Sequence, residues 1–295
     1  PTPYSPFPTP YSLPPRNPLH LTVMKFWKMN GAGNAFVIFD GRKENLGLTP
    51  DQIKAIANPE TGAGADQVIA MESTLRGDVF MRIWNKDGSE AEACGNATRC
   101  VSWLVMEETG KDKLVIETVA ARLKAERLGP TRIAVDMGSP LLKWEEIPLS
   151  ERMDTRGIDL KIGPIDAPYL QLPGVVNMGN PHCIFFVPDL DKVDVKAVGS
   201  LVEWHPLFPQ GVNVGFLQVL SKSEARLRTW ERNAGQTLAC GSNNCAAVVA
   251  AARRNLTDRK VLVHNDGGDI EIDWSELTDH VIMTGPIELE YESKI

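Results

Sequence analysis

The sequence lacks any apolar run long enough to cross a membrane, because its longest, Cys245–Ala252, falls well short of about 18 residues. Cysteine is scarce, at five residues in 295, and its spacing fits neither a C-x-x-C zinc or redox motif nor a disulfide framework. There is no long block of one charge sign, and the formal net charge is -7 from 31 basic and 38 acidic residues. We therefore expect a soluble, cytoplasmic protein with free thiols, no metal, and neither nucleic acid nor membrane as a partner.

Residues 1–23 differ in composition from the rest of the chain. They are rich in proline, and the letters T-P-Y-S occur at 2–5 and again at 9–12. The segment has no amphipathic pattern and lacks the basic and apolar regions of a signal peptide. We expect it to be a disordered extension preceding a start at Met24.

One stretch of the chain occurs twice. Residues 82–96 and 228–242 align with a shift of 146 positions, too long for a solenoid repeat of roughly 20–50 residues. The length also favours two domains of about 150 residues each, so duplicated halves are the better interpretation. The shift places Arg82 on Arg228, Trp84 on Trp230, Ala93 on Ala239, Cys94 on Cys240 and Gly95 on Gly241.

The pattern of short alternating runs predicts an α/β (α+β) fold. Each half is expected to be a curved, mostly antiparallel sheet around one buried helix. One such helix begins after Cys94 and ends near Glu108 before Gly110, and the other runs from Cys240 to about Arg254. The second helix is apolar on all sides, which is typical of a buried helix. Thr49-Pro50 also indicates the start of a shorter helix.

A cysteine at a helix start suggests acid–base chemistry. Unpaired backbone N–H groups and the helix dipole stabilise a thiolate there, which can lower a thiol pKa from about 8.5 to roughly 3.5–7.5. The same N–H groups bind a carboxylate, and the glycines that follow the cysteines let it approach closely. Two such sites face to face could remove a proton from an α-carbon on one side and return one on the other. This would invert an α-amino acid.

The other three cysteines, Cys100, Cys183 and Cys245, are expected to be small buried hydrophobic residues. Cys94 and Cys240 differ from them because they are duplicated. An alternative from another functional class is a thiol-redox protein in which these two cysteines form a switch disulfide. The glycine loop at Asn30–Asn34 lacks the third glycine of a dinucleotide fingerprint, so no nucleotide cofactor is expected.

Seven ordered motifs resemble those of the diaminopimelate epimerase family, a group of cofactor-independent two-thiol epimerases of lysine and peptidoglycan precursor synthesis. They are N-G-A-G-N-A-F, A-D-Q, W-N-K-D-G-S-E-A-E-A-C-G-N-A-T-R-C, M-G-N-P-H-C, V-N-V-G-F, W-E-R-N-A-G-Q-T-L-A-C-G-S and M-T-G. The resemblance extends from Met24 to near the C-terminus. It implies interconversion of LL- and meso-diaminopimelate without pyridoxal phosphate or metal, in a homodimer.

The resemblance also implies roles for individual residues. Cys94 and Cys240 match the two acid–base thiols of the family. His182 matches the histidine that helps to activate the first thiol, and Glu231 matches the glutamate beside the second thiol. The backbone N–H groups that hold the reacting carboxylate match Gly95, Asn96, Gly241 and Ser242. The remaining substrate-binding positions match Asn34, Gln67, Asn85, Asn180, Asn213 and Arg232, with Arg232 on a carboxylate.

The chain departs from the usual family pattern where it reads G-N-A-T-R-C, E-R-N-A-G-Q-T and C-G-S-N-N-C. Asn243 and Asn244, in the first turn of the second cysteine helix, could crowd the substrate or the helix's neighbours and lower turnover. Asn233 and Gln236 are the other unusual residues. The nearest rival function is a related racemase, such as a proline or hydroxyproline epimerase, which would not need Arg232 for a second amino-acid head.

The resemblance implies two similar domains with the active site in the cleft between them. The last strand is expected to return to the first domain. The predicted boundaries are 24–138 with 286–295 for the first domain and 139–285 for the second.

Overall fold

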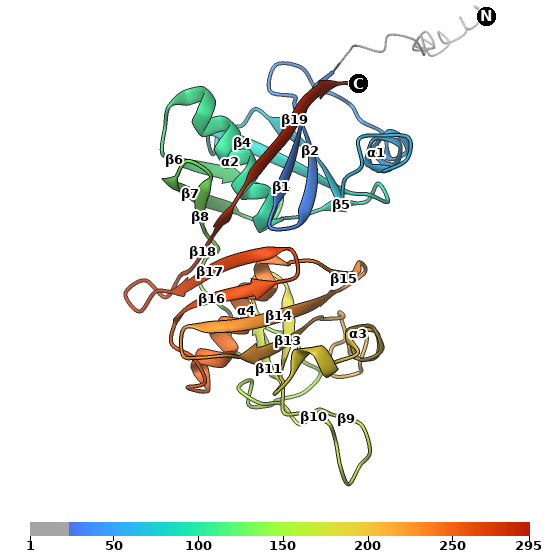
Figure 1. The fold of residues 1–295 in the computed structure, drawn as a ribbon, viewed down its shortest axis with the longest axis vertical. Helices are drawn as coiled ribbons and strands as arrows, with labels where there is room; N and C mark the ends of the chain where they lie inside the picture. Colours follow the sequence, from blue (N-terminus) through green and yellow to red (C-terminus); the bar gives the residue numbers. More distant parts are fainter. Residues whose placement is uncertain (1–23) are drawn as a thin grey trace, which may run out of the picture.

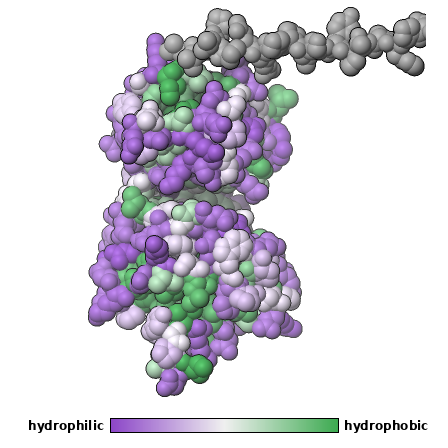
Figure 2. Space-filling view, turned by 90° about the vertical axis from the view of Figure 1, so that its right-hand side faces the viewer, coloured by the Kyte–Doolittle hydropathy of each residue, from purple (hydrophilic) through white to green (hydrophobic). Residues whose placement is uncertain are grey.

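The computed structural model describes residues 24–295, so the prediction for residues 1–23 lies outside the described residues. These residues form two lobes, one above the other in Figure 1, and the space-filling view in Figure 2 shows a constriction between them. Within the described residues, no helix is long and apolar enough to cross a membrane.

The first half of the chain forms eight strands and two helices. Helix α1 begins at a capping box of Thr49 and Gln52 with proline in the first turn, as the sequence predicts. Helix α2 ends at Gly110, whose φ of 69° is the left-handed conformation that glycine adopts without strain. The elements are β1 (Lys25–Gly31), β2 (Asn34–Asp40), α1 (Pro50–Ala57), β3 (Gln67–Glu72), β4 (Val79–Asn85), β5 (Glu90–Ala91), α2 (Gly95–Thr109), β6 (Lys113–Glu117), β7 (Arg122–Gly129) and β8 (Arg132–Asp136).

The second half begins with a separate two-stranded antiparallel sheet, β9 (Lys161–Ile162) and β10 (Leu170–Gln171), and then repeats the order of elements of the first half. Its helix α4 is buried over most of its length, as its apolar sequence predicts. The elements are β11 (Gly174–Asn177), β12 (Pro181–Phe186), η1 (Leu190–Lys192), α3 (Val195–Glu203), β13 (Asn213–Val219), β14 (Glu224–Glu231), β15 (Gly235–Thr237), α4 (Gly241–Arg253), β16 (Lys260–Asn265), β17 (Gly268–Trp274), β18 (Val281–Pro286) and β19 (Glu288–Lys294).

The pairing of the strands confirms the duplication. In the first half, β1–β2, β3–β4, β6–β7 and β7–β8 are antiparallel, whereas β2–β3 and β4–β6 are parallel. In the second half, β11–β12, β13–β14, β16–β17 and β17–β18 are antiparallel, and β12–β13 and β14–β16 are parallel. The order of antiparallel and parallel pairs is the same, so each half has the same topology.

Each sheet curves around its own cysteine helix. Helix α2 packs against β1, β2, β6, β7 and β8, and α4 packs against β11 to β14 and β16 to β18. A continuous cluster of buried apolar residues includes both helices, while two outer clusters lie under α1 and α3. The α/β fold with mostly antiparallel curved sheets around central helices is therefore confirmed.

The two halves exchange segments where they meet. Strand β8 pairs antiparallel with β18, which joins the two sheets. After β8 the chain enters the second half, where Leu141 forms a bridge with Asn177 at the end of β11. After β18 the chain returns to the first half, where β19 pairs with β1 (Figure 1).

Candidate active site

The two duplicated cysteines are the N-caps of the two central helices. Cys94 precedes α2 in an extended conformation, and its Sγ accepts a hydrogen bond from the backbone N–H of Ala97 at 3.5 Å. Cys240 occupies the same place before α4, and its Sγ lies 3.5 Å from Ser242 Oγ. Both thiols are thus placed at helix N-termini, as the sequence predicts.

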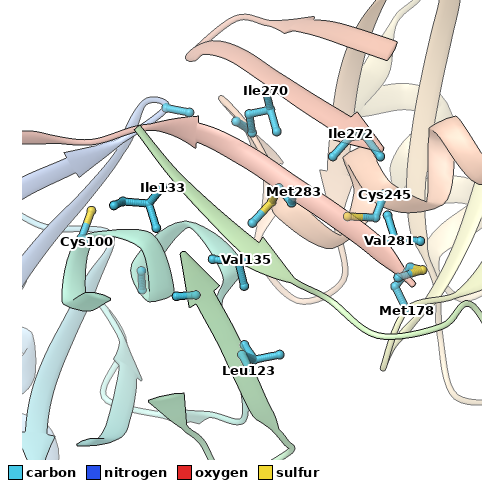
Figure 3. Packing of buried hydrophobic residues seen from close by; sticks show 14 of the residues in the cluster. Cys100, Leu123, Ile133, Val135, Met178, Cys245, Ile270, Ile272, Val281 and Met283 are labelled. Atoms are coloured by element: carbon cyan, nitrogen blue, oxygen red, sulfur yellow. The ribbon is translucent and has the colours of Figure 1, made fainter. Parts of the chain in front are cut away.

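The two helix starts meet at Met283 of β18. A Cβ atom on Gly95 would lie 2.7 Å from Met283 Cε, and one on Gly241 would lie 2.9 Å from Met283 Sδ. Asn96 Nδ2 also donates across the halves to the carbonyl of Ala239 at 3.4 Å. Figure 3 shows Met283 between the first half, marked by Cys100, and the second half, marked by Cys245. The residues after both cysteines therefore lie against the same Met283 side chain, and a side chain at either glycine would require Met283 to move.

The surroundings raise the pKa of both thiols, contrary to the expectation of a lowered pKa. Backbone N–H groups of the first turn do lower the pKa of Cys94, but burial outweighs them and raises it to about 11. Burial also raises the pKa of Cys240 well above its usual range. The negative charge of Glu231 raises both values further. The expectation failed because desolvation depends on the tertiary structure around the helix start.

Glu231 lies beside the Cys240 thiol at the end of β14. Its Oε1 accepts a hydrogen bond from Thr237 Oγ1 at 2.6 Å, which holds the carboxyl group across the β14–β15 hairpin. Burial is the largest effect on Glu231 and raises its pKa, while its hydrogen bonds to Cys240 and Thr237 lower it. Such a carboxyl group can exchange a proton with the neighbouring thiol.

Four predicted substrate-binding residues line the first half of the site. Asn96 is buried and donates to Asn34 Oδ1 at 2.7 Å, while Gln67 Nε2 donates to Asn85 Oδ1 at 3.0 Å. Gln67 pairs across the β2–β3 ladder with Phe36, two residues after Asn34. The side-chain oxygens Gln67 Oε1 and Asn96 Oδ1 are buried, and neither has a hydrogen-bond partner among the described residues. Buried polar atoms are normally satisfied, so these two are free to bind a ligand.

The remaining predicted residues form a second group in the second half. Asn180 Oδ1 lies 2.8 Å from His182 Nε2. Asn213 Nδ2 donates to the carbonyl of Pro181 at 3.0 Å, and its Oδ1 accepts from the backbone N–H of Arg232, also at 3.0 Å. This group therefore connects β12, β13 and the end of β14.

Arg232 is held at one end of its guanidinium group. Its Nη1 donates to the carbonyl of Gln210 at 2.6 Å. No carboxylate among residues 24–295 forms a salt bridge with it, which leaves the group available to an acidic ligand. The side chain is half-buried, so a carboxylate bound there would be partly shielded from water.

The structure accommodates the unusual residues. Asn233 has a φ of 64°, in the left-handed region that asparagine tolerates better than most residues. Gln236 is exposed. Asn243 and Asn244 are fully buried, and both have hydrogen-bond partners inside the second half. Their side chains thus fit among the neighbours of α4, whereas an effect on the substrate or on turnover stays a prediction.

Two residues near the thiols were not among the predicted site residues, although both lie within the quoted motifs, Arg99 in G-N-A-T-R-C and Met283 in M-T-G. Met283 separates the helix starts, and Arg99 of α2 is fully buried with Nη1 at 3.5 Å from Met283 Sδ. Nε and Nη2 of Arg99 have no partner within the described part of the chain. Its positive charge lowers the pKa of Cys94. Cys100, Cys183 and Cys245 are fully buried and free, as predicted.

Comparison with known proteins gives consistent matches along the chain. A family model described as diaminopimelate epimerase matches residues 26–143 and 174–290. Diaminopimelate epimerase of Caulobacter vibrioides is 50% identical over 279 residues, covering 92% of this chain and 96% of that protein. The enzyme of the same name from Phenylobacterium zucineum is 48% identical over 270 residues, covering 92% and 97%.

Solved structures with much lower sequence identity share the fold. A hydroxyproline epimerase from Agrobacterium vitis, bound to trans-4-hydroxy-L-proline, superposes with a TM-score of 0.65 at 15% identity, covering 93% of each chain. A phenazine biosynthesis protein of the PhzF family from Bacillus anthracis gives a TM-score of 0.62 at 15% identity, covering 93% of this chain and 99% of that one. At such identities the likeness concerns the fold alone.

Proposed function

This chain belongs to the diaminopimelate epimerase family, and from this premise we propose that it interconverts LL- and meso-2,6-diaminopimelate by two-base proton transfer at one α-carbon. The observation that carries the proposal is the pair of cysteine N-caps on two helices whose first residues meet at Met283. The pathway served would be the synthesis of lysine and peptidoglycan precursors. The site would act without pyridoxal phosphate, metal or nucleotide.

The reacting carboxylate binds between the two helix N-termini. The backbone N–H groups of Gly95, Asn96, Gly241 and Ser242 lie in the first turns, where helix N–H groups have no intrahelical acceptor. They bind the carboxylate in the ground state and stabilise the enolate-like charge that develops on it when the α-proton leaves. Asn96 also holds the two halves in register through its bond to Ala239.

The proton transfer uses one thiolate and one thiol. The thiolate takes the α-proton and becomes a thiol, while the opposite thiol gives its proton to the other face of the carbon and becomes a thiolate. Each turnover therefore exchanges the protonation states of Cys94 and Cys240. The raised pKa of both thiols means that substrate must favour the thiolate, and the positive α-ammonium group supplies that change.

The second amino-acid group of diaminopimelate, at the end remote from the reacting α-carbon, determines which substrate is accepted. The helix N-termini would hold any α-carboxylate and cannot distinguish diaminopimelate from a simple amino acid. Arg232 has no carboxylate partner in the described chain and can bind the distal carboxylate in bidentate fashion, which a neutral side chain cannot do. Asn34, Gln67, Asn85, Asn180 and Asn213 supply the polar groups around it.

We also propose that the functional protein is a cytoplasmic homodimer that does not bind nucleic acid. Five free thiols support a reducing compartment, and the net charge of -7 does not favour nucleic acid. Within each chain, residues 24–138 with 286–295 would form the first domain and 139–285 the second. The pairing of β19 with β1 supports this division.

Exchange of the α-hydrogen with solvent tests the proposed reaction. Incubation with LL-diaminopimelate in deuterated water should place deuterium at one α-carbon and produce the meso isomer. Cys240→Ala should lose this activity, whereas Cys245→Ala, five residues along the same helix, is the matched control and should keep it. Proline, hydroxyproline and lysine should not exchange. Faster exchange with one of these than with diaminopimelate would favour the rival racemase function.

A further inference from the structure

Asn243 occupies a fully buried position in the first turn of α4. Its side chain contacts three other elements. Nδ2 donates to Thr229 Oγ1 of β14 at 2.7 Å and lies 3.4 Å from the carbonyl oxygen of Val214 on β13. Oδ1 lies 3.1 Å from Nδ1 of His182 on β12.

These contacts determine which way the amide points. The Val214 carbonyl oxygen can only accept a hydrogen bond, so the Nδ2 group must be on that side. The Asn243 oxygen therefore faces His182, and an amide oxygen can only accept. Nδ1 of His182 must then carry a hydrogen to donate.

The neutral imidazole of His182 carries only one N–H group, either at Nδ1 or at Nε2. The ring is fully buried, and burial lowers its pKa to about 3, so it is neutral near neutral pH. A neutral imidazole has one donor nitrogen and one acceptor nitrogen. If Nδ1 is the donor, Nε2 carries the lone pair.

We propose that Asn243 is a positioning residue that holds His182 in the tautomer protonated at Nδ1, so that Nε2 acts as a hydrogen-bond acceptor on the side of Asn180. The role of this acceptor in catalysis rests on the proposed function, whereas the tautomer itself does not. The Asn180 atom that lies 2.8 Å from Nε2 is Oδ1, which cannot donate to a lone pair, so in this tautomer the half-buried Asn180 amide turns to present Nδ2 to the ring.

The surroundings of Asn243 are shaped to keep it in place. Gly215 of β13 lies opposite the amide, and a Cβ atom there would be 3.0 Å from both Nδ2 and Oδ1 of Asn243. The glycine leaves room for the amide between β13 and α4. Because the side chain is satisfied at both ends and enclosed, it cannot turn over without losing hydrogen bonds in a buried site.

An acceptor at Nε2 suits the proposed chemistry. A lone pair there can accept a hydrogen bond from Asn180 Nδ2, which leaves Asn180 Oδ1 facing away from the ring as an acceptor for a substrate ammonium group. The opposite tautomer would present an N–H group and hold Oδ1 at the ring instead. Asn243 would thus orient Asn180, a predicted substrate-binding residue, through His182.

Nitrogen NMR of protein labelled with ¹⁵N-histidine tests the tautomer directly. The His182 signals, identified by their absence in His182→Gln, should show a protonated Nδ1 and an unprotonated Nε2 in the wild-type protein. Asn243→Ala should give a mixed or reversed pattern, because the acceptor for Nδ1–H is lost. Thr229→Val is a milder variant of nearly the same shape that removes only the hydroxyl group that orients the amide. It should shift the pattern in the same direction.

Asn244→Ala is the matched control. Asn244 is adjacent and equally buried, but it bonds to the Cys240 carbonyl and to Asn265 instead of His182. Its substitution should leave the His182 pattern unchanged. A wild-type signal protonated at Nε2, or identical patterns in wild type and Asn243→Ala, would overturn the proposal.

Kinetics separate this inference from the proposed function. For Asn243→Ala we expect kcat/KM for epimerisation to fall by about tenfold, because Asn180 would no longer be held to receive the substrate, and one such hydrogen bond contributes on the order of tenfold. If the wild-type protein did not epimerise diaminopimelate at all, the proposed function would fail while the NMR result still decided the tautomer.

Discussion

The raised pKa of Cys94 predicts that this thiol is unusually slow to alkylate despite its place at a helix N-terminus. A pKa of about 11 gives a thiolate fraction of about 10⁻³ at pH 8, against about 0.2 for an ordinary thiol with a pKa of about 8.5. Because the thiolate is the reactive form, iodoacetamide should modify Cys94 on the order of 100-fold more slowly than a free thiol at that pH.

The measurement is the initial rate of alkylation at Cys94 against pH, followed by mass spectrometry of the peptide that contains it. Between pH 7 and pH 10 the alkylation rate should rise about tenfold per pH unit without levelling off, because the pH stays below the pKa of the thiol throughout this range. Glu231→Gln removes a negative charge that raises this pKa, so the variant should react faster at every pH. A rate that levels off below pH 9, or one equal to that of free cysteine at pH 8, would refute the reasoning.

Four further predictions follow from the same geometry. Cys94→Ala and Cys240→Ala should each lower epimerisation by about 10²–10⁴-fold or more with the circular dichroism spectrum unchanged, and near-normal turnover in either would rule out two-base transfer. Arg232→Lys should lose much of the activity, measured as kcat/KM, because an ammonium group cannot replace a bidentate guanidinium; unchanged kinetics would place the distal carboxylate elsewhere. Gly241→Ala should lower activity, because its Cβ atom would lie 2.9 Å from Met283 Sδ and the methionine side chain would have to shift between the helix starts; full turnover would show that Met283 moves aside without affecting the site. Since the folded pKa of His182 is about 3 and the unfolded value is about 6.5, the unfolded state binds more protons between these values. The free energy of unfolding, measured by urea denaturation, should therefore fall as the pH drops below about 6.5, by up to about 1.4 kcal/mol per pH unit. The fall should be smaller in His182→Gln. An equal fall in wild type and variant would contradict a buried, neutral imidazole ring.

Local patterns were sufficient to predict the helices that carry the thiols. The N-cap position of Cys94 and the left-handed Gly110 follow from residue types alone, and the apolar sequence of the second helix predicts its burial. Helix α3 was missed although Val195, Val198 and Val202 recur at helical spacing after the capping residue Asp194. That signal was available in the sequence.

Other features depend on contacts between distant residues and have no local signature. His182 and Asn243 are 61 positions apart, and only the placement of β12 against α4 brings them within 3.1 Å. The pKa of Cys94 was wrongly expected to be low because the helix N-terminus is visible in the sequence, whereas the burial that outweighs it is not. The sequence marks Asn243 only as a departure from the family pattern, and its contact with His182 is visible only in the folded chain.

The reciprocal crossing of the chain between the halves has an evolutionary consequence. Each half contributes the segment that bridges the first strand of the other: β19 pairs with β1, and the bridge at Leu141 reaches β11. A half-length ancestor could make both contacts only by exchanging its last segment with a second copy, in the manner of a domain-swapped homodimer. The single cysteine of one chain would then have faced the same cysteine of the other chain across the twofold axis. Gene fusion would have preserved this geometry while freeing the two thiols to acquire different neighbours.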